Sequence, residues 1–399
     1  MASTNGLAVL RTVQEGNGAL KAAAGPALTA SRLRRQVGRQ HAVSYATGAT
    51  PPPPAATTAT GDPVVYMTDL LQRTDRTSYL ISHFFPAKHH RTPYLALRAF
   101  NAELAQIRES VSNELLGRIR IGWWRDAVRA LYAAVEHARD EKEGPSAGRP
   151  KKAPRIPAHP VLSALYTSLT DPVLRSMPTA GLLHSEHHLQ ALITAREDDL
   201  STPVGPPTLD AVERYAERTA SRLAYLELDL LGVRDAQMDE VSSHIGKARG
   251  LANLLASVPF HARMLRAPQA LPTSRARSLT LPQEYLVARD VVEEEVYRMG
   301  ADAPGLRDAV FDTATRANDY LISARSALAR ARFPSPTGIG GTTDKVPAVL
   351  FPALIGAVPA QDYLTRLEKA NFDPFEPSLQ QAGWRLSWAL WRASRTGKF

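Results

Sequence analysis

The sequence contains no cysteine among its 399 residues. This absence excludes a disulfide-stabilised scaffold, a zinc site built from thiolates and a cysteine nucleophile, and it is typical of a reducing compartment. The sequence also lacks an uninterrupted apolar run of about 18 residues, the length that a membrane-spanning helix needs. The best candidate, residues 346–358, is too short and contains Pro352. We therefore expect no membrane span.

Acidic residues are nearly absent from the N-terminal region. Residues 1–61 hold six basic residues and a single acid, Glu15. The whole chain carries a formal charge of +9, so residues 62–399 carry only +4. Such a nearly balanced charge over a large domain is not typical of nucleic-acid-binding proteins, and we expect no nucleic-acid partner.

The same N-terminal region is rich in Ala, Ser, Thr and Arg, a composition typical of a mitochondrial transit peptide. The run PPPPAATTATGDP at 51–63 is typical of a stiff linker without regular structure. We predict a disordered transit peptide and Pro-rich linker over residues 1–63, and a location in the mitochondrial matrix. The alternative is a basic tail without a targeting role, which is common at chain ends.

Residues 64–399 show helical spacing of apolar residues and almost none of the alternation that is typical of strands. Pro93 suits the first turn of a helix. Apolar residues at helical spacing predict a long helix within 113–142: Leu116, Ile119, Trp123, Val128, Leu131 and Val135. We expect further helices at 160–169, 181–198, 208–231, 238–258, 283–298, 303–331, 360–371 and 377–396. The pattern predicts one all-α domain.

Common catalytic motifs are missing from the chain. His184 and His188 have the i, i+4 spacing of a metal-binding helix face, but Glu186 does not stand where a zinc protease needs its glutamate. A solvated polar face explains these histidines better. GIGG at 338–341 has no following Gly-Lys-Ser/Thr, and no serine lies in a Gly-x-Ser-x-Gly context. We expect no cofactor, no metal site and no catalytic residue.

Residues 244–261 combine a helical pattern with glycines at 246 and 250, although glycine inside a helix costs about 1 kcal/mol relative to alanine. Positions three and four apart share one helix face. That face carries small or polar side chains: Gly246, Gly250, Asn253, Ser257 and His261. It either packs closely against another backbone or lines a cavity.

Several segments resemble, in their order along the chain, the squalene and phytoene synthases. YLALRAFNAELAQIRESV and HIGKARGLANLLASVPFHARML resemble the two helices that carry this family's aspartate motifs. RTDRTSYLISHFFP, IGWWRDAV, PAHPVLSAL and ITAREDDL resemble further landmarks of the family. The resemblance covers about residues 64–330. It implies that residues 64–399 form a single helical domain of the isoprenoid-synthase type.

NFDPFEPSLQQ at 371–381, followed by a tryptophan-rich helix, resembles one branch of this family. Members of that branch help to assemble mitochondrial respiratory complex I, the NADH:ubiquinone oxidoreductase. The resemblance implies that subunits of complex I or other assembly factors are the partners of this chain.

The resemblance also allows a test of the metal site. The synthases hold magnesium ions and a diphosphate between aspartates of the two motif helices, because Mg²⁺ prefers oxygen ligands. Ala105 and Glu109 stand at the aspartate positions of the first helix; Ser257 and His261 stand at the outer acidic positions of the second helix, with Phe260 at the inner one. Three of the four main carboxylates are replaced, so the resemblance implies that metal binding is lost.

A cavity between the two motif helices could persist without the metals and hold an isoprenoid or lipid-like ligand. The residues expected to line it are Asn101, Gly246, Lys247, Gly250 and Asn253. Close packing of the two glycines against a neighbouring helix is an equally good interpretation.

Three functions remain open. The first is a non-catalytic assembly factor for complex I that uses a prenyl-synthase fold. The second is an active prenyl transferase that uses other acids, for example Glu103, Glu109, Glu197 and Asp198. The third is a helical adaptor unrelated to respiration.

Contact with the inner membrane is a separate question. Trp384, Trp388 and Trp391 recur at helical spacing, with Arg385, Arg392 and Arg395 beside them. This pattern fits a peripheral membrane site, and it fits an ordinary core helix equally well.

Overall fold

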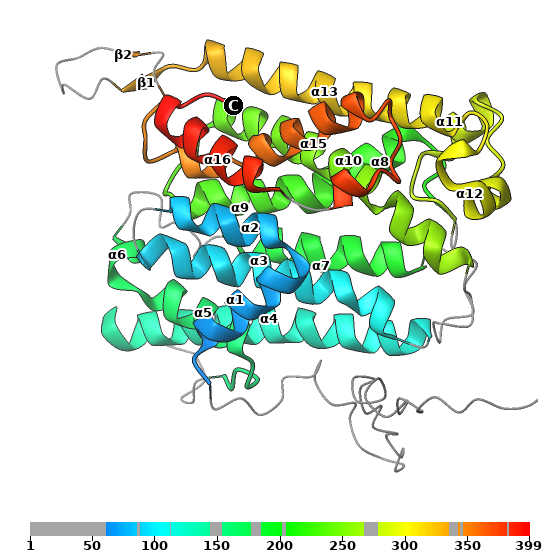
Figure 1. Ribbon diagram of the computed structural model, residues 1–399. Helices are drawn as coiled ribbons and strands as arrows, with labels where there is room; N and C mark the ends of the chain where they lie inside the picture. The colour runs from blue at the N-terminus through cyan, green and yellow to red at the C-terminus, as the bar shows by residue number, and fades with distance from the viewer. Residues whose placement is uncertain are drawn as a thin grey trace, which may run out of the picture. The chain divides into compact units, whose positions relative to one another are not determined.

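The computed structural model describes residues 61–85, 88–111, 113–143, 154–176, 185–201, 205–266, 278–334, 342–343, 346–380 and 383–399. The predicted transit segment and nearly all of the linker lie outside the described residues, as does His184. Regular structure in the described ranges is almost entirely helical (Figure 1). The prediction of an all-α domain is confirmed.

The helices of the first half are α1 (Pro63–Thr74), α2 (Arg76–Ile81), α3 (Lys88–Ser110), α4 (Glu114–Glu143), α5 (Pro160–Thr170), α6 (Pro172–Arg175) and α7 (Glu186–Ser201). A 3₁₀ turn, η1, follows α2 (Ser82–Phe84).

The second half contains α8 (Leu209–Ala216), the π-helical turn η3 (Glu217–Ser221), α9 (Arg222–Leu230), α10 (Ala236–Arg266), α11 (Gln283–Ala288), α12 (Glu293–Met299), η5 (Gly300–Asp302), α13 (Leu306–Arg330), α14 (Phe351–Leu354), α15 (Ala357–Lys369), η6 (Pro377–Gln380) and α16 (Trp384–Thr396). Two strands of two residues each, β1 (Phe333–Pro334) and β2 (Thr342–Thr343), pair antiparallel after α13.

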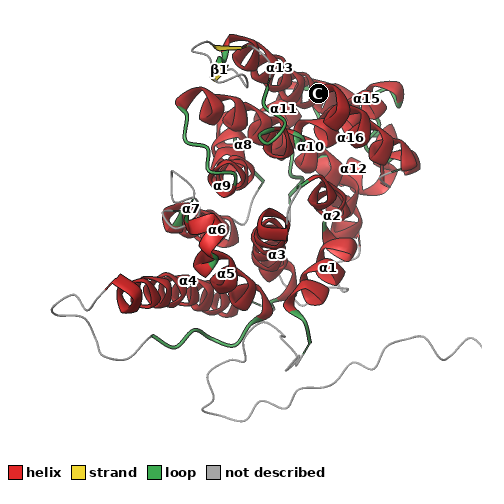
Figure 2. Ribbon diagram, turned by 90° about the vertical axis from the view of Figure 1, so that its left-hand side faces the viewer, coloured by secondary structure: helices red, strands yellow, loops and turns green. Residues whose placement is uncertain are grey.

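The long helices run side by side in layers (Figures 1 and 2). α4 packs against α5 and α7, and α3 packs against α1, α5, α7 and α9. α10 packs against α8, α9, α13 and α15. The two helices that resemble the aspartate motifs are α3 and α10, and we call them the motif helices.

Four helix predictions need correction. The helix expected at 377–396 begins at Trp384, after the separate 3₁₀ turn η6. α3 begins at Lys88, so Pro93 lies inside the helix instead of in its first turn. The helix expected at 283–298 is two helices, α11 and α12, because Asp290 between them has a φ of 52° that ends the first. The helix expected at 208–231 contains the π-helical turn η3.

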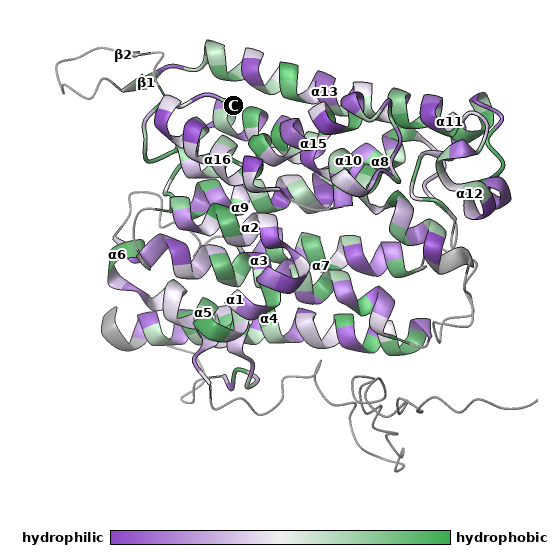
Figure 3. Ribbon diagram, in the orientation of Figure 1, coloured by the Kyte–Doolittle hydropathy of each residue, from purple (hydrophilic) through white to green (hydrophobic). Residues whose placement is uncertain are grey.

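Hydrophobic side chains of every layer contribute to one core. Trp124, Phe100 and Tyr94 are fully buried within it. Figure 3 shows hydrophobic and hydrophilic residues alternating along each long helix, as expected for helices that bury one face and expose another. No helix in the described part of the chain is long and apolar enough to cross a membrane.

His159 is the N-cap of α5 and belongs to the segment PAHPVLSAL. Its side chain is buried, and its ring lies edge-on to the rings of Trp123, Trp124 and Tyr66. The backbone N–H of Val161 donates to Nδ1 of His159 at 3.2 Å, which requires an unprotonated nitrogen. Burial lowers the pKa of His159 to about 4, so the ring is neutral in the folded chain at pH 7.

We expect His159 to make the fold sensitive to acid. The pKa of a histidine is 6.5 in its ordinary state and about 4 here. At pH values between these, the unfolded chain binds a proton that the folded chain excludes, so stability falls as the pH falls from 6.5 towards 4. The loss from this group between pH 7 and pH 5 is about 2 kcal/mol.

The matched variant for this prediction is His159→Asn, because asparagine also accepts a hydrogen bond at a helix N-cap and does not titrate. Urea unfolding at pH 7 and pH 5 measures the pH effect in both proteins. The difference between the two pH values should shrink by about 2 kcal/mol in the variant. An unchanged difference would contradict the assignment.

Candidate functional site

The five positions that the family resemblance assigns to the metal motifs lie in the C-terminal halves of α3 and α10. On α3, Ala105 is half-buried and Glu109 is exposed. On α10, the hydroxyl of Ser257 donates to the carbonyl of Leu254 at 2.7 Å. Its oxygen also lies 3.2 Å from the hydroxyl oxygen of Thr280. Glu109 is the only carboxylate among these five positions, which by themselves do not supply the oxygen ligands that Mg²⁺ prefers.

Phe260 and His261 lie one turn further along α10. The ring of Phe260 is 37% exposed, and it lies edge-on to that of His261 with centroids 5.3 Å apart. Among the residues that the structure describes, no three His, Asp or Glu side chains are close enough to hold a metal ion together.

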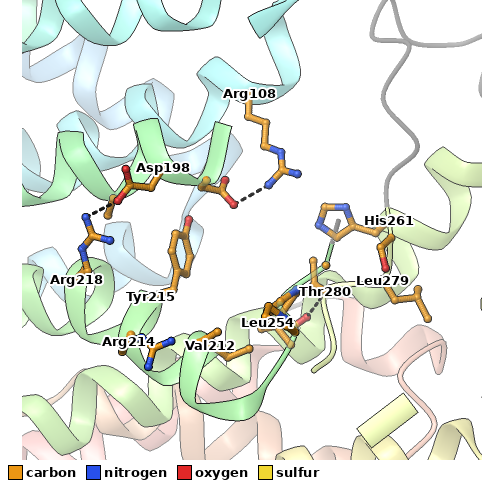
Figure 4. Close-up of a pocket in the computed structure, with 17 residues that line it drawn as sticks. Arg108, Asp198, Val212, Arg214, Tyr215, Arg218, Leu254, His261, Leu279 and Thr280 are labelled. Atoms are coloured by element: carbon orange, nitrogen blue, oxygen red, sulfur yellow. Dashed lines mark hydrogen bonds and ion pairs between the residues drawn. The ribbon is translucent and has the colours of Figure 1, made fainter. Parts of the chain in front are cut away.

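A pocket of about 300 Å³ opens at this end of the motif helices (Figure 4). Arg108 of α3 and His261 of α10 both line it, and the rest of its wall comes from α7, α8, η3 and the segments 205–207 and 278–280. Apolar side chains supply much of the lining: Ala195, Pro206, Pro207, Ala211, Val212, Leu254 and Leu279. The sequence did not indicate this combination of elements.

Arginines pair with the acids of this pocket. Arg108 donates from Nη1 to Oδ1 of Asp199 at 2.7 Å, and Arg218 donates from Nη2 to Oδ2 of Asp198 at the same distance. Both pairs are drawn in Figure 4. Because each carboxylate already has a cationic partner, the pocket presents balanced or positive charge, which disfavours a divalent cation.

Tyr215 lies between these pairs on α8. Burial raises the pKa of Tyr215 to about 12, although Arg196 donates a hydrogen bond to its hydroxyl and lowers the pKa in part. The phenol is therefore neutral at pH 7, and it adds a polar group without charge to the pocket.

Two other acids considered for metal binding, Glu103 and Glu197, also have hydrogen-bond partners in the protein. Glu103 accepts a hydrogen bond from the hydroxyl of Tyr66, and burial raises the pKa of its carboxyl. Glu197 accepts from Nη2 of Arg125 at 2.5 Å. Tyrosine and arginine thus take the places that a metal would need.

The glycines of α10 make close contact with a neighbouring helix. A Cβ added at Gly246 would lie 2.4 Å from Cα of Ser221, in the π-helical turn η3. A Cβ added at Gly250 would lie 2.5 Å from Cβ of Ala216 in α8. Close helix packing, and not a cavity, therefore explains both glycines.

Two of the other expected lining residues have polar partners. Oδ1 of Asn101 accepts from Nη2 of Arg196 at 3.1 Å. Nζ of Lys247 lies 3.6 Å from Oε2 of Glu217 and 5.5 Å from the centre of the Tyr320 ring.

Asn253 lies elsewhere. It is exposed and borders a smaller pocket of about 170 Å³, which α10 forms with α2, α15 and α16. The five expected lining residues therefore do not gather around one cavity.

A cluster of charges lies between the motif helices instead, and we call it the central charge cluster: the buried Arg98, Glu227 and Arg249 and the half-buried Asp75, with Ser78 beside them. Arg98 of α3 forms an ion pair with Glu227 of α9, and these residues are 4% and 3% exposed. Nη2 of Arg249 on α10 lies 2.8 Å from Oγ of Ser78 and 3.8 Å from Oδ2 of Asp75.

The charges of the cluster stabilise one another. Burial alone would raise the pKa of Asp75, but Arg249 and Arg98 outweigh it and hold this pKa below its ordinary value. The cluster is not predicted from the sequence, although a signal for it is present. Arg98 and Glu227 each interrupt an apolar run, in YLALRAF and LAYLELDLL.

Comparisons with known proteins agree with this geometry. The family model described as squalene/phytoene synthase matches residues 71–392. The chain belongs to the squalene/phytoene synthase family. Family membership explains why two long helices with paired motif positions face a common region, and it confirms the predicted fold and resemblance.

Two relatives align with this chain over most of its length. A rat protein named NADH dehydrogenase (ubiquinone) complex I, assembly factor 6 is 33% identical over 83% of this chain and 81% of its own. The mouse protein of that name is 32% identical over 82% and 80%.

A solved structure shows the same fold. The crystal structure of a dehydrosqualene synthase in complex with ligand superimposes with a TM-score of 0.56 over 84% of this chain and 96% of that chain, at 16% identity.

Proposed function

We propose that this chain is a non-catalytic assembly factor for mitochondrial respiratory complex I. The observation that carries the proposal is the set of residues at the metal positions: Ala105, Ser257 and His261 stand where the family resemblance places carboxylates. The names of the rat and mouse relatives support the role in complex I assembly.

The proposal includes a location and a division of the chain. Residues 1–63 would act as a transit peptide and linker, and residues 64–399 would form the helical domain in the matrix, peripherally at the inner membrane. The basic, acid-poor composition of the first segment supports the import step. Complex I subunits or other assembly factors would be the direct partners.

The pocket at the ends of the motif helices suits a ligand with an apolar body and an anionic group. Its apolar walls would bury the body, and Arg108 or Arg218 would offer guanidinium donors to the anion. Such a ligand would act without turnover.

Deleting the gene and measuring assembled complex I on native gels tests the proposal. We expect a reduced level of complex I, restored by the wild-type chain and equally by the Glu109→Ala variant. Glu109 is the only carboxylate retained at the four main metal positions. A prenyl transferase should lose most of its activity when this metal ligand is removed.

The two negative outcomes are distinct. A normal level of complex I in the deleted cells would remove the assembly role. Failure of Glu109→Ala to restore complex I, while accumulating to the wild-type level, would favour the prenyl transferase.

A further inference from the structure

Helix α16 carries large apolar side chains on two opposite faces. Leu386, Leu390 and Ala393 are buried against the domain, where α16 packs on α15. The opposite face carries three exposed indoles, with exposed fractions of 76% at Trp384, 53% at Trp388 and 55% at Trp391. The core interpretation of these tryptophans is therefore wrong, because leucine and alanine make the core contact.

The same helix carries charge of one sign only. Residues 383–399 contain no acid and four basic side chains, all exposed: Arg385, Arg392, Arg395 and Lys398. The guanidinium carbon of Arg385 lies 5.9 Å from the Trp384 ring, and that of Arg392 lies 5.7 Å from the Trp388 ring. Aromatic rings and cations thus share the exposed face, which we call the Trp–Arg face.

We propose that the Trp–Arg face binds the surface of a bilayer that contains anionic phospholipids. Tryptophan favours the boundary between headgroups and acyl chains, since its ring is apolar and its N–H is polar. Basic side chains beside it gain attraction from anionic headgroups. A helix with both features lies in the plane of the interface, so α16 would orient the domain on the membrane.

Charge argues against the two occupants that this chain itself could offer. A second copy would place two acid-free basic faces against each other, and like charges repel. Residues 1–61 carry +5, so the N-terminal segment would be repelled as well. An anionic lipid surface complements the Trp–Arg face, and vesicles of defined composition can test this occupant directly.

The full chain is suited to a fluorescence test, because most of its five tryptophans lie on the Trp–Arg face and their emission responds to contact with a membrane. Three lie on the Trp–Arg face, Trp124 is fully buried and Trp123 is partly buried. Residues 1–61 contain no tryptophan, so binding through the basic N-terminal segment does not change the signal. Phosphatidylcholine vesicles with and without phosphatidylglycerol, carrying brominated acyl chains, serve as the probe.

We expect a blue shift and strong quenching of tryptophan emission with the anionic vesicles, and little change with phosphatidylcholine alone. Arg385→Gln/Arg392→Gln/Arg395→Gln should weaken this binding by at least roughly tenfold, as should high salt. Trp384→Ala/Trp388→Ala/Trp391→Ala should reduce co-sedimentation with the vesicles to the level that the N-terminal segment supports. The control variant removes three exposed apolar side chains from other helices: Leu115→Ala/Val287→Ala/Ile322→Ala. It should bind the vesicles as the wild type does.

Three results would overturn the inference: wild-type emission that anionic vesicles do not change, co-sedimentation without quenching, or a wild-type dimer in solution that the tryptophan substitutions dissociate. The inference rests on the membrane-side location in the proposed function. Failure of this inference and failure of the proposed function can be told apart. The vesicle experiment needs no complex I, and the native-gel experiment needs no vesicle binding.

Discussion

Replacing Glu227 with alanine should lower the free energy of unfolding by about 3–5 kcal/mol. The substitution leaves the guanidinium of Arg98 buried without its carboxylate partner, in a seam where Arg98 is 4% exposed. Arg249 lies in the same cluster, so two cations would then share Asp75. Urea unfolding followed by circular dichroism measures the loss.

Two controls separate a buried unpaired charge from a general loss of contacts. The double variant Arg98→Met/Glu227→Leu removes both charges and should regain most of the lost stability, because apolar pairs often replace buried ion pairs without cost. Arg129→Ala breaks an exposed pair with Asp126 at 3.5 Å and should cost less than about 1 kcal/mol. A Glu227→Ala loss no larger than that of Arg129→Ala would refute the cluster's structural role.

Replacing Gly246 with alanine should destabilise the fold by about 1–3 kcal/mol, as overpacking of a core does. The added Cβ would lie 2.4 Å from Cα and 2.6 Å from the backbone N of Ser221, and a backbone cannot rotate away as a side chain can. α10 or η3 must therefore shift, which disturbs the contact between these helices.

Gly122→Ala is the matched control, because Gly122 also lies inside a long helix and a Cβ added there meets nothing within 4 Å. Alanine favours a helix over glycine by about 1 kcal/mol, so this variant should be slightly more stable than the wild type. The same urea measurement compares both. Equal effects of the two substitutions would show that Gly246 is not required for close packing.

Much of the fold is predictable from this sequence because it depends on local spacing. Apolar residues three and four apart predict α5 and α13 to within three residues, and the order of motif segments predicts the family. The proposed loss of carboxylates also comes from the sequence, since the family resemblance places Ala105 and Ser257 at acidic positions of the motifs. The sequence leaves two interpretations of the glycine pair of α10, a cavity lining or close helix packing. The structure shows close packing.

The rest depends on which helices meet, and that is a tertiary property. Arg98, Glu227 and Arg249 come from three helices, and periodicity within one helix says nothing about partners on another. The pairing of Arg108 with Asp199 across the pocket is hidden for the same reason. The sequence alone does not predict whether Trp384 is exposed, because tryptophans at helical spacing occur both on buried and on exposed helix faces.

The central claim is that the motif helices no longer support magnesium-dependent diphosphate chemistry. Release of inorganic diphosphate from farnesyl or geranylgeranyl diphosphate, with the purified full chain and added Mg²⁺, tests this claim most directly. We expect a rate equal to that of buffer alone and no difference between the wild type and Glu109→Ala. Magnesium-dependent release that Glu109→Ala abolishes would contradict it.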